Sequence, residues 1–295
     1  MKSAHASARF GALACEALEF ELALAPKPGL VTPVDRGSHA DMDHRTFRAS
    51  IAALRPYFVD CARLGARGAP FAALQARGLT AEGEMFAATG GVNTHKGAIF
   101  TLGLLVAAAA AEYAEAGAVD GAALGRVVRR RWASGLSQGP DSRYTSNGVL
   151  ALRLHGIPGA REHAAAGFPV LFAVTLPALR QAFERGADAR RAGVHALLST
   201  MAVLPDTNLV HRGGPSGLAW VQASSEGFVA AGSVFNADWE ARLRGLADEF
   251  VGRWLSPGGA ADLLAAGWLL HRLGEAFPAV HEHECAVDAG AGLRV

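Results

Sequence analysis

Apolar residues recur along most of this chain at a spacing of three and four, which is the period of an amphipathic helix. The first such stretch runs from Ala8 to Leu24 and ends before Pro26 and Pro28, because proline cannot continue a helix. A second stretch starts at Asp43. The same reasoning predicts further helices over residues 81–89, 96–116, 121–134, 144–155, 168–184, 188–204, 236–255 and 259–276.

Strand patterns are scarce, although Gly217 to Val234 fits either a hairpin or another helix. Residues 116–121 and 135–145 have the composition of loops, and the last 15 residues, after Val280, have that of a polar tail. No internal repeat or long linker is evident. The pattern therefore predicts an all-α fold, in which residues 1–295 form a single multi-helix globular domain with ligand-binding loops at helix N-termini.

Composition indicates a sizeable core and no global electrostatic partner. The apolar share is 51%, and 28 Lys and Arg residues nearly balance 27 Asp and Glu residues. Because no excess charge would attract nucleic acid or an anionic membrane, neither is expected as a partner. The longest apolar run, Ala98 to Ala111, has about 14 residues, whereas a membrane span needs ~20. A buried helix is expected there.

The cysteines and the N-terminus bear on the cellular compartment. Cys15, Cys61 and Cys285 lie far apart without a CxxC pair, which argues against a disulfide framework and against a cysteine zinc site. Acidic residues interrupt the apolar stretch that a signal peptide would need, at Glu16, Glu19 and Glu21. A cytoplasmic protein is therefore expected.

The segment from Lys27 to Asp43 is the first of four that concentrate chemically unusual residues. Asp41 and Asp43 stand at a loop-to-helix junction beside His39, and two such carboxylates can share a hard cation such as Mg²⁺. The alternative is that one of them only caps the helix. The sequence leaves both interpretations open.

The second segment, from Gly83 to Phe100, leads from clustered glycines into a helix. Glycines let the backbone approach a ligand, a helix N-terminus offers free N–H groups, and Lys96 adds a positive charge. The preferred interpretation is a phosphate cradle formed by Gly90, Gly91, Asn93, Thr94, His95, Lys96 and Gly97. It is not a Walker A loop, because GxxxxGK[ST] is absent. The alternative is a helix C-cap followed by an N-cap, with His95 and Lys96 merely exposed.

The third segment, from Leu204 to Gly214, repeats the spacing of two oxygen-bearing side chains with Asp206 and Asn208. Arg212 could clamp a phosphate bidentately while Asp206 and Asn208 hold a cation. An Asx turn that caps a loop explains the same residues. Neither interpretation is excluded.

The fourth segment, from Ser256 to Ala265, places Pro257 and two glycines ahead of Asp262. Ordinary helix-start chemistry is the preferred interpretation for it. Glu16 and Glu84 lie within apolar helical patterns near these segments, and they are second-tier candidates because a helix-borne carboxylate usually faces solvent.

These segments together resemble the triphosphoribosyl-dephospho-CoA synthases, which make the prosthetic-group precursor for citrate lyase and malonate decarboxylase. The matching strings are KPGLV (27–31), GSHADMD (37–43), GGVNTHKGAIF (90–100), GFP (167–169), DTNLVHRGG (206–214) and SPGGAADLLA (256–265). The chain departs from the family at Arg161, which is followed directly by Glu162 and His163 where the family has Arg-x-Glu. No role is therefore carried over to Glu162.

The resemblance implies an all-α fold and the reaction of ATP with 3′-dephospho-CoA to give 2′-(5″-triphosphoribosyl)-3′-dephospho-CoA and adenine. Malonate decarboxylase is the favoured downstream system, in which the product is passed on for attachment to an acyl-carrier subunit. The transition state should resemble an oxocarbenium ion.

The roles that follow from the resemblance fall into three groups. Mg²⁺ on the triphosphate would be held by Asp41, Asp43 and Asp206, with Glu84 as a further carboxylate. Phosphate and nucleotide contacts would come from Lys27, Gly90, Gly91, Asn93, Thr94, Lys96, Asn208 and Arg212. Catalysis would use His95, Asp43 and Glu84, and either His95 or a carboxylate free of metal is the general base.

Two other classes of function remain open from the sequence. A Mg²⁺-dependent helical hydrolase of a nucleotide or ADP-ribose would use the same carboxylates but activate water. A non-catalytic carrier would bind a CoA-derived cofactor or an acyl-carrier subunit without turnover. Release of adenine that requires dephospho-CoA separates transfer from both.

Overall fold

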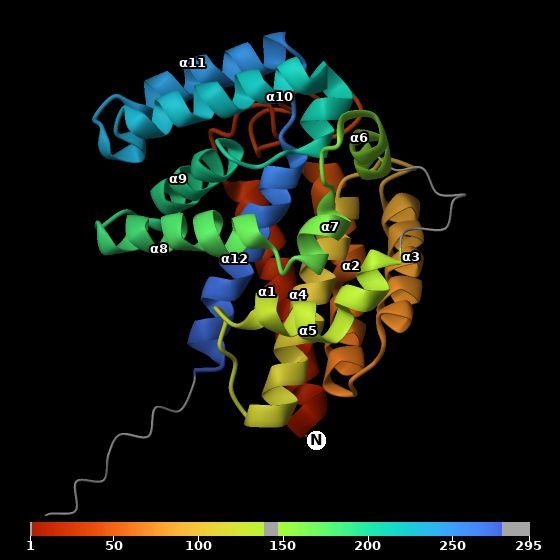
Figure 1. Ribbon diagram of the computed structural model, residues 1–295. Coiled ribbons are helices and arrows are strands. Elements are labelled where there is room, and N and C mark those ends of the chain that lie inside the picture. The colour runs from red at the N-terminus through yellow and green to blue at the C-terminus, as the bar shows by residue number, and fades with distance from the viewer. Residues whose placement is uncertain (1, 139–146, 279–295) are drawn as a thin grey trace, which may run out of the picture.

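The computed structural model describes residues 2–138 and 147–278 (Figure 1). Its helices are α1 (Lys2–Ala23), α2 (His44–Ala66), α3 (Phe71–Ala88), α4 (Lys96–Ala116), α5 (Leu124–Ser137), α6 (Asn147–His155), α7 (Ala160–Ala165), α8 (Leu176–Glu184), α9 (Ala189–Met201), α10 (Thr207–Ala230), α11 (Trp239–Gly252) and α12 (Gly258–Ala276). A π-helical turn (Leu171–Thr175) precedes α8, and a 3₁₀ turn (Ser233–Phe235) follows α10. The described residues contain no strand, so the predicted all-α fold is confirmed.

Several helices differ from the sequence prediction in their boundaries, and one was not predicted. Helix α3 begins at Phe71 rather than near residue 81, because Pro70 provides an extended N-cap before an apolar pattern that is sparse. Helix α5 continues to Ser137, since Trp132 and Leu136 are buried on its inner face. Helix α7 has only six residues, too few for a periodic pattern to reveal it.

The segment that fitted a hairpin or a helix, residues 217–234, lies mostly in α10. That helix is kinked where Gly214 adopts φ 65° ahead of Pro215. The predicted loop over residues 135–145 begins within α5, which continues to Ser137, and from residue 139 on it lies outside the described residues, as does the predicted tail after Val280.

Helix α4 is the centre of the molecule, and α1, α2, α3, α5 and α12 all pack against it (Figure 1). Its apolar run is buried almost without interruption from Ala98 to Ala111. In the described part of the chain, α4 alone is long and apolar enough to pass as a membrane span, but 72% of that apolar window is buried inside the protein. A core helix has this property.

Close helix contacts explain one of the central glycines. A Cβ added to Gly65 of α2 would lie 2.0 Å from the carbonyl oxygen of Ala107 in α4, so only glycine lets these two backbones approach so closely. The tight α2–α4 contact fixes the N-terminus of α4 relative to the start of α2.

Candidate active site

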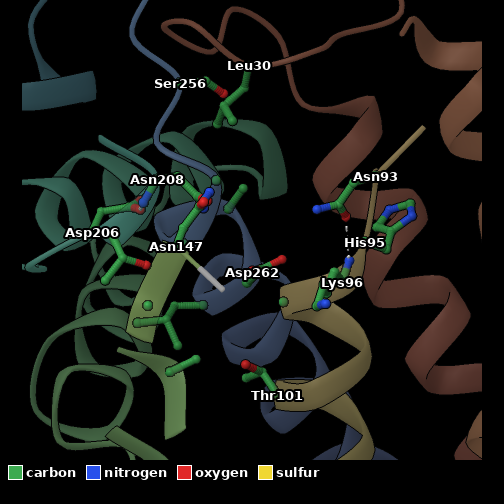
Figure 2. A pocket seen from close by; sticks show the side chains of 18 of the residues that line it. Leu30, Asn93, His95, Lys96, Thr101, Asn147, Asp206, Asn208, Ser256 and Asp262 are labelled. Carbon is green, nitrogen blue, oxygen red and sulfur yellow. Dashed lines mark hydrogen bonds between the residues drawn. The ribbon is translucent and has the colours of Figure 1, made fainter. Parts of the chain in front are cut away.

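A cavity of about 570 Å³ opens where several helices begin. Its lining includes the first residues, or the residues just before them, of α4, α6, α7, α10 and α12, together with part of α1 and of the loop between α1 and α2 (Figure 2). A helix N-terminus has unpaired N–H groups and a positive partial charge, which favour anions. The fold thus brings the N-termini of several helices to one cavity.

The structure brings many of the predicted site residues together on this lining. They are Asp41, Asn93, Thr94, His95, Lys96, Asp206, Asn208 and Arg212. The remaining predicted residues do not line the cavity; these are Lys27, Asp43, Glu84, Gly90 and Gly91.

Asp43 and Glu84 have structural contacts away from the cavity. The Asp43 carboxylate accepts hydrogen bonds from the backbone N–H groups of Arg45 (2.9 Å) and Thr46 (3.1 Å) and so caps α2. These bonds lower the pKa of Asp43. Glu84 is paired at 3.2 Å with Arg77 of the same helix. The catalytic and metal-binding roles of the two carboxylates stay predictions. The capping bonds of Asp43 and the ion pair of Glu84 explain both residues without such a role.

Gly90 and Gly91 form the turn between α3 and α4, with φ values of 66° and 91° and open space around both. This is the C-cap geometry that was the alternative to a phosphate cradle. The part of the segment that reaches the cavity begins at Asn93.

Lys27 is buried and paired with a residue that the sequence analysis did not select. Its Nζ donates to Oε1 of Glu21 at 2.5 Å and to the backbone oxygen of Glu21 at 2.6 Å. Lys27 is only 2% exposed, and burial lowers its pKa while the Glu21 carboxylate opposes that shift. Lys27 therefore holds Glu21, which does line the cavity.

His95 is a buried, neutral imidazole on the cavity lining. Its Nδ1 lies 2.8 Å from Oγ of Ser50, and its ring makes an edge contact with Phe47. Burial, reinforced by the positive charge of Lys27, lowers the pKa of His95 to about 3. Its Nε2 is buried and has no partner among the described residues. A neutral ring whose second nitrogen is free can accept a proton.

Two other polar atoms on the lining are buried without a partner in the described part of the chain, Oγ1 of Thr94 and Nε2 of His163. Burial also lowers the pKa of His163. Buried polar atoms in native structures are nearly always satisfied. A cavity with three unsatisfied atoms on its wall therefore fits a polar ligand.

Asp206 ties together the starts of two helices. Its carboxylate accepts hydrogen bonds from the N–H groups of Asn208 (2.9 Å) and Ala260 (3.1 Å), which belong to α10 and α12. Burial raises its pKa to about 6, and these backbone bonds oppose the shift. A Cβ on Gly259 would sit 3.0 Å from this carboxylate, which explains the glycine there. The metal-binding role of Asp206 stays a prediction.

Asp262 also lines the cavity, although its sequence context favoured plain helix-start chemistry. Its carboxyl group has no hydrogen-bond partner among residues 2–138 and 147–278. A Cβ on Gly97 would lie 2.0 Å from its Oδ2, so the first turn of α4 packs directly on it. Burial raises the pKa of Asp262 well above its usual value, and the charges of Asp206 and Glu21 add to the effect.

Three charged residues form the exposed edge of the lining, which we call the rim: Asp41, Lys96 and Arg212. Arg212 donates to the backbone oxygens of Ser38 (2.8 Å) and Trp254 (3.2 Å). The side chain of Lys96 is 46% exposed and that of Asp41 62% exposed. The rim can therefore exchange ligands with solvent.

The site and the fold define a class, that of an all-helical enzyme with a cavity suited to an anionic substrate. Residues 7–280 match the ATP:dephospho-CoA triphosphoribosyl transferase family. The chain therefore belongs to this family, as its motifs indicated.

Relatives agree with this assignment. The chain is 40% identical over 264 residues to the 2-(5″-triphosphoribosyl)-3′-dephosphocoenzyme-A synthase of Pectobacterium atrosepticum, covering 86% of each chain. It is 38% identical over 273 residues to the synthase of the same name from Klebsiella pneumoniae, covering 89% of each. A relative from Acinetobacter calcoaceticus is 38% identical over 256 residues, covering 87% of this chain and 88% of its own. No solved structure matches the chain.

Proposed function

We propose that this enzyme transfers the triphosphoribosyl group of ATP to the 2′-hydroxyl of 3′-dephospho-CoA and releases adenine. The observation that carries the proposal is the convergence of the family motifs on one cavity whose wall has unsatisfied polar atoms. The family description and the names of the relatives supply the substrates.

The triphosphate end of ATP is assigned to the rim. Arg212 supplies positive charge there, together with Lys96, whose Nζ also pairs with Glu82 at 2.8 Å, and the N-terminus of α4 supplies N–H donors. Arg212 suits this task because its guanidinium is already oriented by two backbone oxygens. Binding the triphosphate at the rim would leave the sugar and the base for the inner part of the cavity.

The residues present fit a Mg²⁺ ion that arrives with ATP. No group of three or more His, Cys, Asp or Glu side chains within the described residues could form a complete cage. Mg²⁺ is commonly held by one or two carboxylates plus substrate phosphates. Asp41 fits this role because its carboxylate is exposed at the rim near Arg212, whereas the Asp206 oxygens already accept backbone hydrogen bonds. The ion would neutralise triphosphate charge.

His95 is assigned as the general base. Its free Nε2 would take the proton from the 2′-hydroxyl as that oxygen bonds to C1′ of the ribose, while the bond from C1′ to N9 of adenine breaks. Ser50 fixes the ring through Nδ1. Asn93 and Asn208, both on the lining, have amide groups suited to ribose hydroxyls.

The downstream system is a second part of the proposal. We assign the product to malonate decarboxylase, the system that the motif resemblance favoured, where it would be attached to an acyl-carrier subunit. Attachment to a citrate lyase carrier is the competing outcome, and transfer assays with each carrier would separate the two.

Chromatographic detection of free adenine tests the reaction directly. The purified protein is mixed with ATP and Mg²⁺, with and without 3′-dephospho-CoA, and the acceptor is analysed by mass spectrometry. Adenine formed only with the acceptor, together with a matching mass increase of the acceptor, supports ribosyl transfer. Adenine formed without the acceptor would indicate a hydrolase, and no adenine in either mixture would indicate a binding protein.

A further inference from the structure

The carboxyl group of Asp262 has no task in the mechanism above, although it lies on the cavity wall. In the view of Figure 2 it lies between Asp206 and Asn208 on one side and His95 and Lys96 on the other. It comes from the first turns of α12 and packs against Gly97 at the start of α4. The Asp262 carboxyl group therefore lies between the first turn of α4 and the cavity that would hold the ligand.

The charged groups that most influence the Asp262 carboxyl group are carboxylates. Glu21 faces it from α1 and Asp206 from the cap of α10, and both disfavour a negative charge on it. The nearest buried cation, Lys27, is hydrogen-bonded to Glu21. No described cation bonds to Asp262, so burial and the two neighbouring carboxylates favour the protonated form of its carboxyl group.

A protonated carboxyl group has one O–H donor and one carbonyl acceptor. This is the pattern with which a carboxamide recognises adenine, by donating to N7 and accepting from the N6 amino group. The carboxyl group differs from a carboxamide in one respect: it can give its proton away. Adenine leaves as a neutral molecule only if it gains a proton when the bond between C1′ and N9 breaks.

We propose that Asp262 binds the N7 and N6 edge of the adenine of ATP and donates its proton to N7 as the C1′–N9 bond breaks. This inference rests on the proposed ribosyl transfer. The electron pair of the broken bond goes to the adenine ring, the Asp262 O–H bond becomes an N7–H bond, and the 2′-hydroxyl proton goes to His95. After adenine leaves, His95 gives its proton to solvent and the Asp262 carboxylate regains one from solvent, so both groups return to their starting states. Asp262 is thus the general acid of the reaction.

The salt bridge of Glu21 beside Asp262 supports this assignment. Lys27 forms a salt bridge with Glu21 at 2.5 Å, and the Glu21 carboxylate favours the protonated form of Asp262. The buried ion pair therefore has a positioning role at this site.

The first test combines D262N with an altered substrate. Asparagine keeps both hydrogen bonds to adenine but cannot deliver a proton, so the KM for ATP should change by no more than a few-fold while kcat falls by about 10²–10⁴-fold. The triphosphate of 7-deazaadenosine lacks N7, and wild type should process it with a similar loss. Because both changes remove one proton transfer, D262N should process the deaza substrate no more slowly than it processes ATP.

Several outcomes would overturn the assignment. These are wild-type turnover of the deaza substrate at the ATP rate, multiplication of the two losses in the combined experiment, or recovery of D262N in excess Mg²⁺, which would make Asp262 a metal ligand. The wild-type experiment holds even if D262N does not fold. Failure of wild type to release adenine from ATP is a different result, since it contradicts ribosyl transfer itself. D248N, at an exposed position on α11, is the matched control and should keep wild-type kcat.

Discussion

The imidazole of His95 makes the stability of this protein depend on pH in a defined direction. Its pKa is about 3 in the folded chain, against a usual value of 6.5. Between these two values the unfolded chain binds more protons than the folded one, so stability is present above pH 6.5 and is lost as the pH falls toward 3.

The variant H95Q removes this titration. Wild type should lose more stability than H95Q between pH 7.5 and pH 5, with a difference that grows by at most about 1.4 kcal/mol for each pH unit below 6.5. Urea unfolding of both proteins at the two pH values measures it. The same pH dependence in both proteins would show that His95 is protonated in the folded state.

The buried pair of Glu21 and Lys27 gives a second prediction. The variant K27M leaves the Glu21 carboxylate without its partner, so it should destabilise the protein by about 3–5 kcal/mol. The double variant E21Q/K27M has no unpaired charge buried at this position, so it should be more stable than K27M alone. Chemical denaturation measures both differences.

An exposed pair provides the control for that experiment. Arg48 and Glu19 lie 3.7 Å apart with both side chains substantially exposed, so R48M should cost no more than about 1 kcal/mol. Equal losses in K27M and R48M would contradict the assignment of Lys27 as a buried ion-pair partner.

At the scale of single residues, the predicted positions that line the cavity lie mostly where a motif enters a helix. Asn93, His95, Lys96, Asp206, Asn208 and Arg212 were selected and do line one cavity. Lys27 was predicted to bind phosphate and Asp262 to be an ordinary helix-start residue, because their contacts arise only in the folded structure. Lys27 forms a hydrogen bond with Glu21, and Asp262 packs against Gly97 of another helix. No local pattern contains this information.

At the scale of the elements, the contact between α2 and α4 positions His95 relative to Ser50. The variant G65A adds a methyl group where the Ala107 backbone lies. Overpacking of this kind costs about 1–3 kcal/mol or more, because backbone cannot rotate away as a side chain can. G65A should lower the Tm and reduce kcat.

The control for that change is G245A on α11, where nothing lies within 4 Å of the added methyl group. Alanine is the better helix former by about 1 kcal/mol, so G245A should raise the Tm or leave it unchanged. Thermal unfolding of the two variants side by side separates steric strain from helix propensity. A rise in Tm for G65A would refute the close α2–α4 approach.

Helix periodicity predicted the central helix well, but it missed the first part of α3 and left most of α10 undecided. The central helix over residues 96–116 has the predicted bounds, because its apolar run is long and is followed by Gly117 in a left-handed conformation. Helix α7 was not predicted because it is shorter than two turns. The choice between hairpin and helix over residues 217–234 depended on packing against the rest of the domain.

At the scale of the whole molecule, we expect the proposed Mg²⁺ ion to be needed for catalysis but not for the stability of the fold. The described residues hold their fold through a helical core and contain no group of three metal-ligating side chains. Chelation with EDTA should therefore stop adenine release while the Tm of the ligand-free protein stays unchanged. Calorimetry with and without EDTA measures this, and a large drop in Tm would reveal a structural metal.

The cavity as a whole could not be predicted from the sequence, although its parts were. Each motif read alone fitted a helix cap as well as a site, and Asp43 is a cap in the structure. Convergence of the helix N-termini of α4, α10 and α12 on one cavity is the observation on which the proposed site rests. That convergence is a property of the packing, to which every helix contributes.

The walls of the cavity come from residues as far apart as Leu18 and Ala265. As the chain emerges from a ribosome, the helix with Asp262 is the last of the described helices to appear, and it packs against the first, α1. The site therefore cannot assemble on an incomplete chain. A nascent chain stalled before α12 would have most of its core but no competent cavity, and it could not consume ATP before folding was complete.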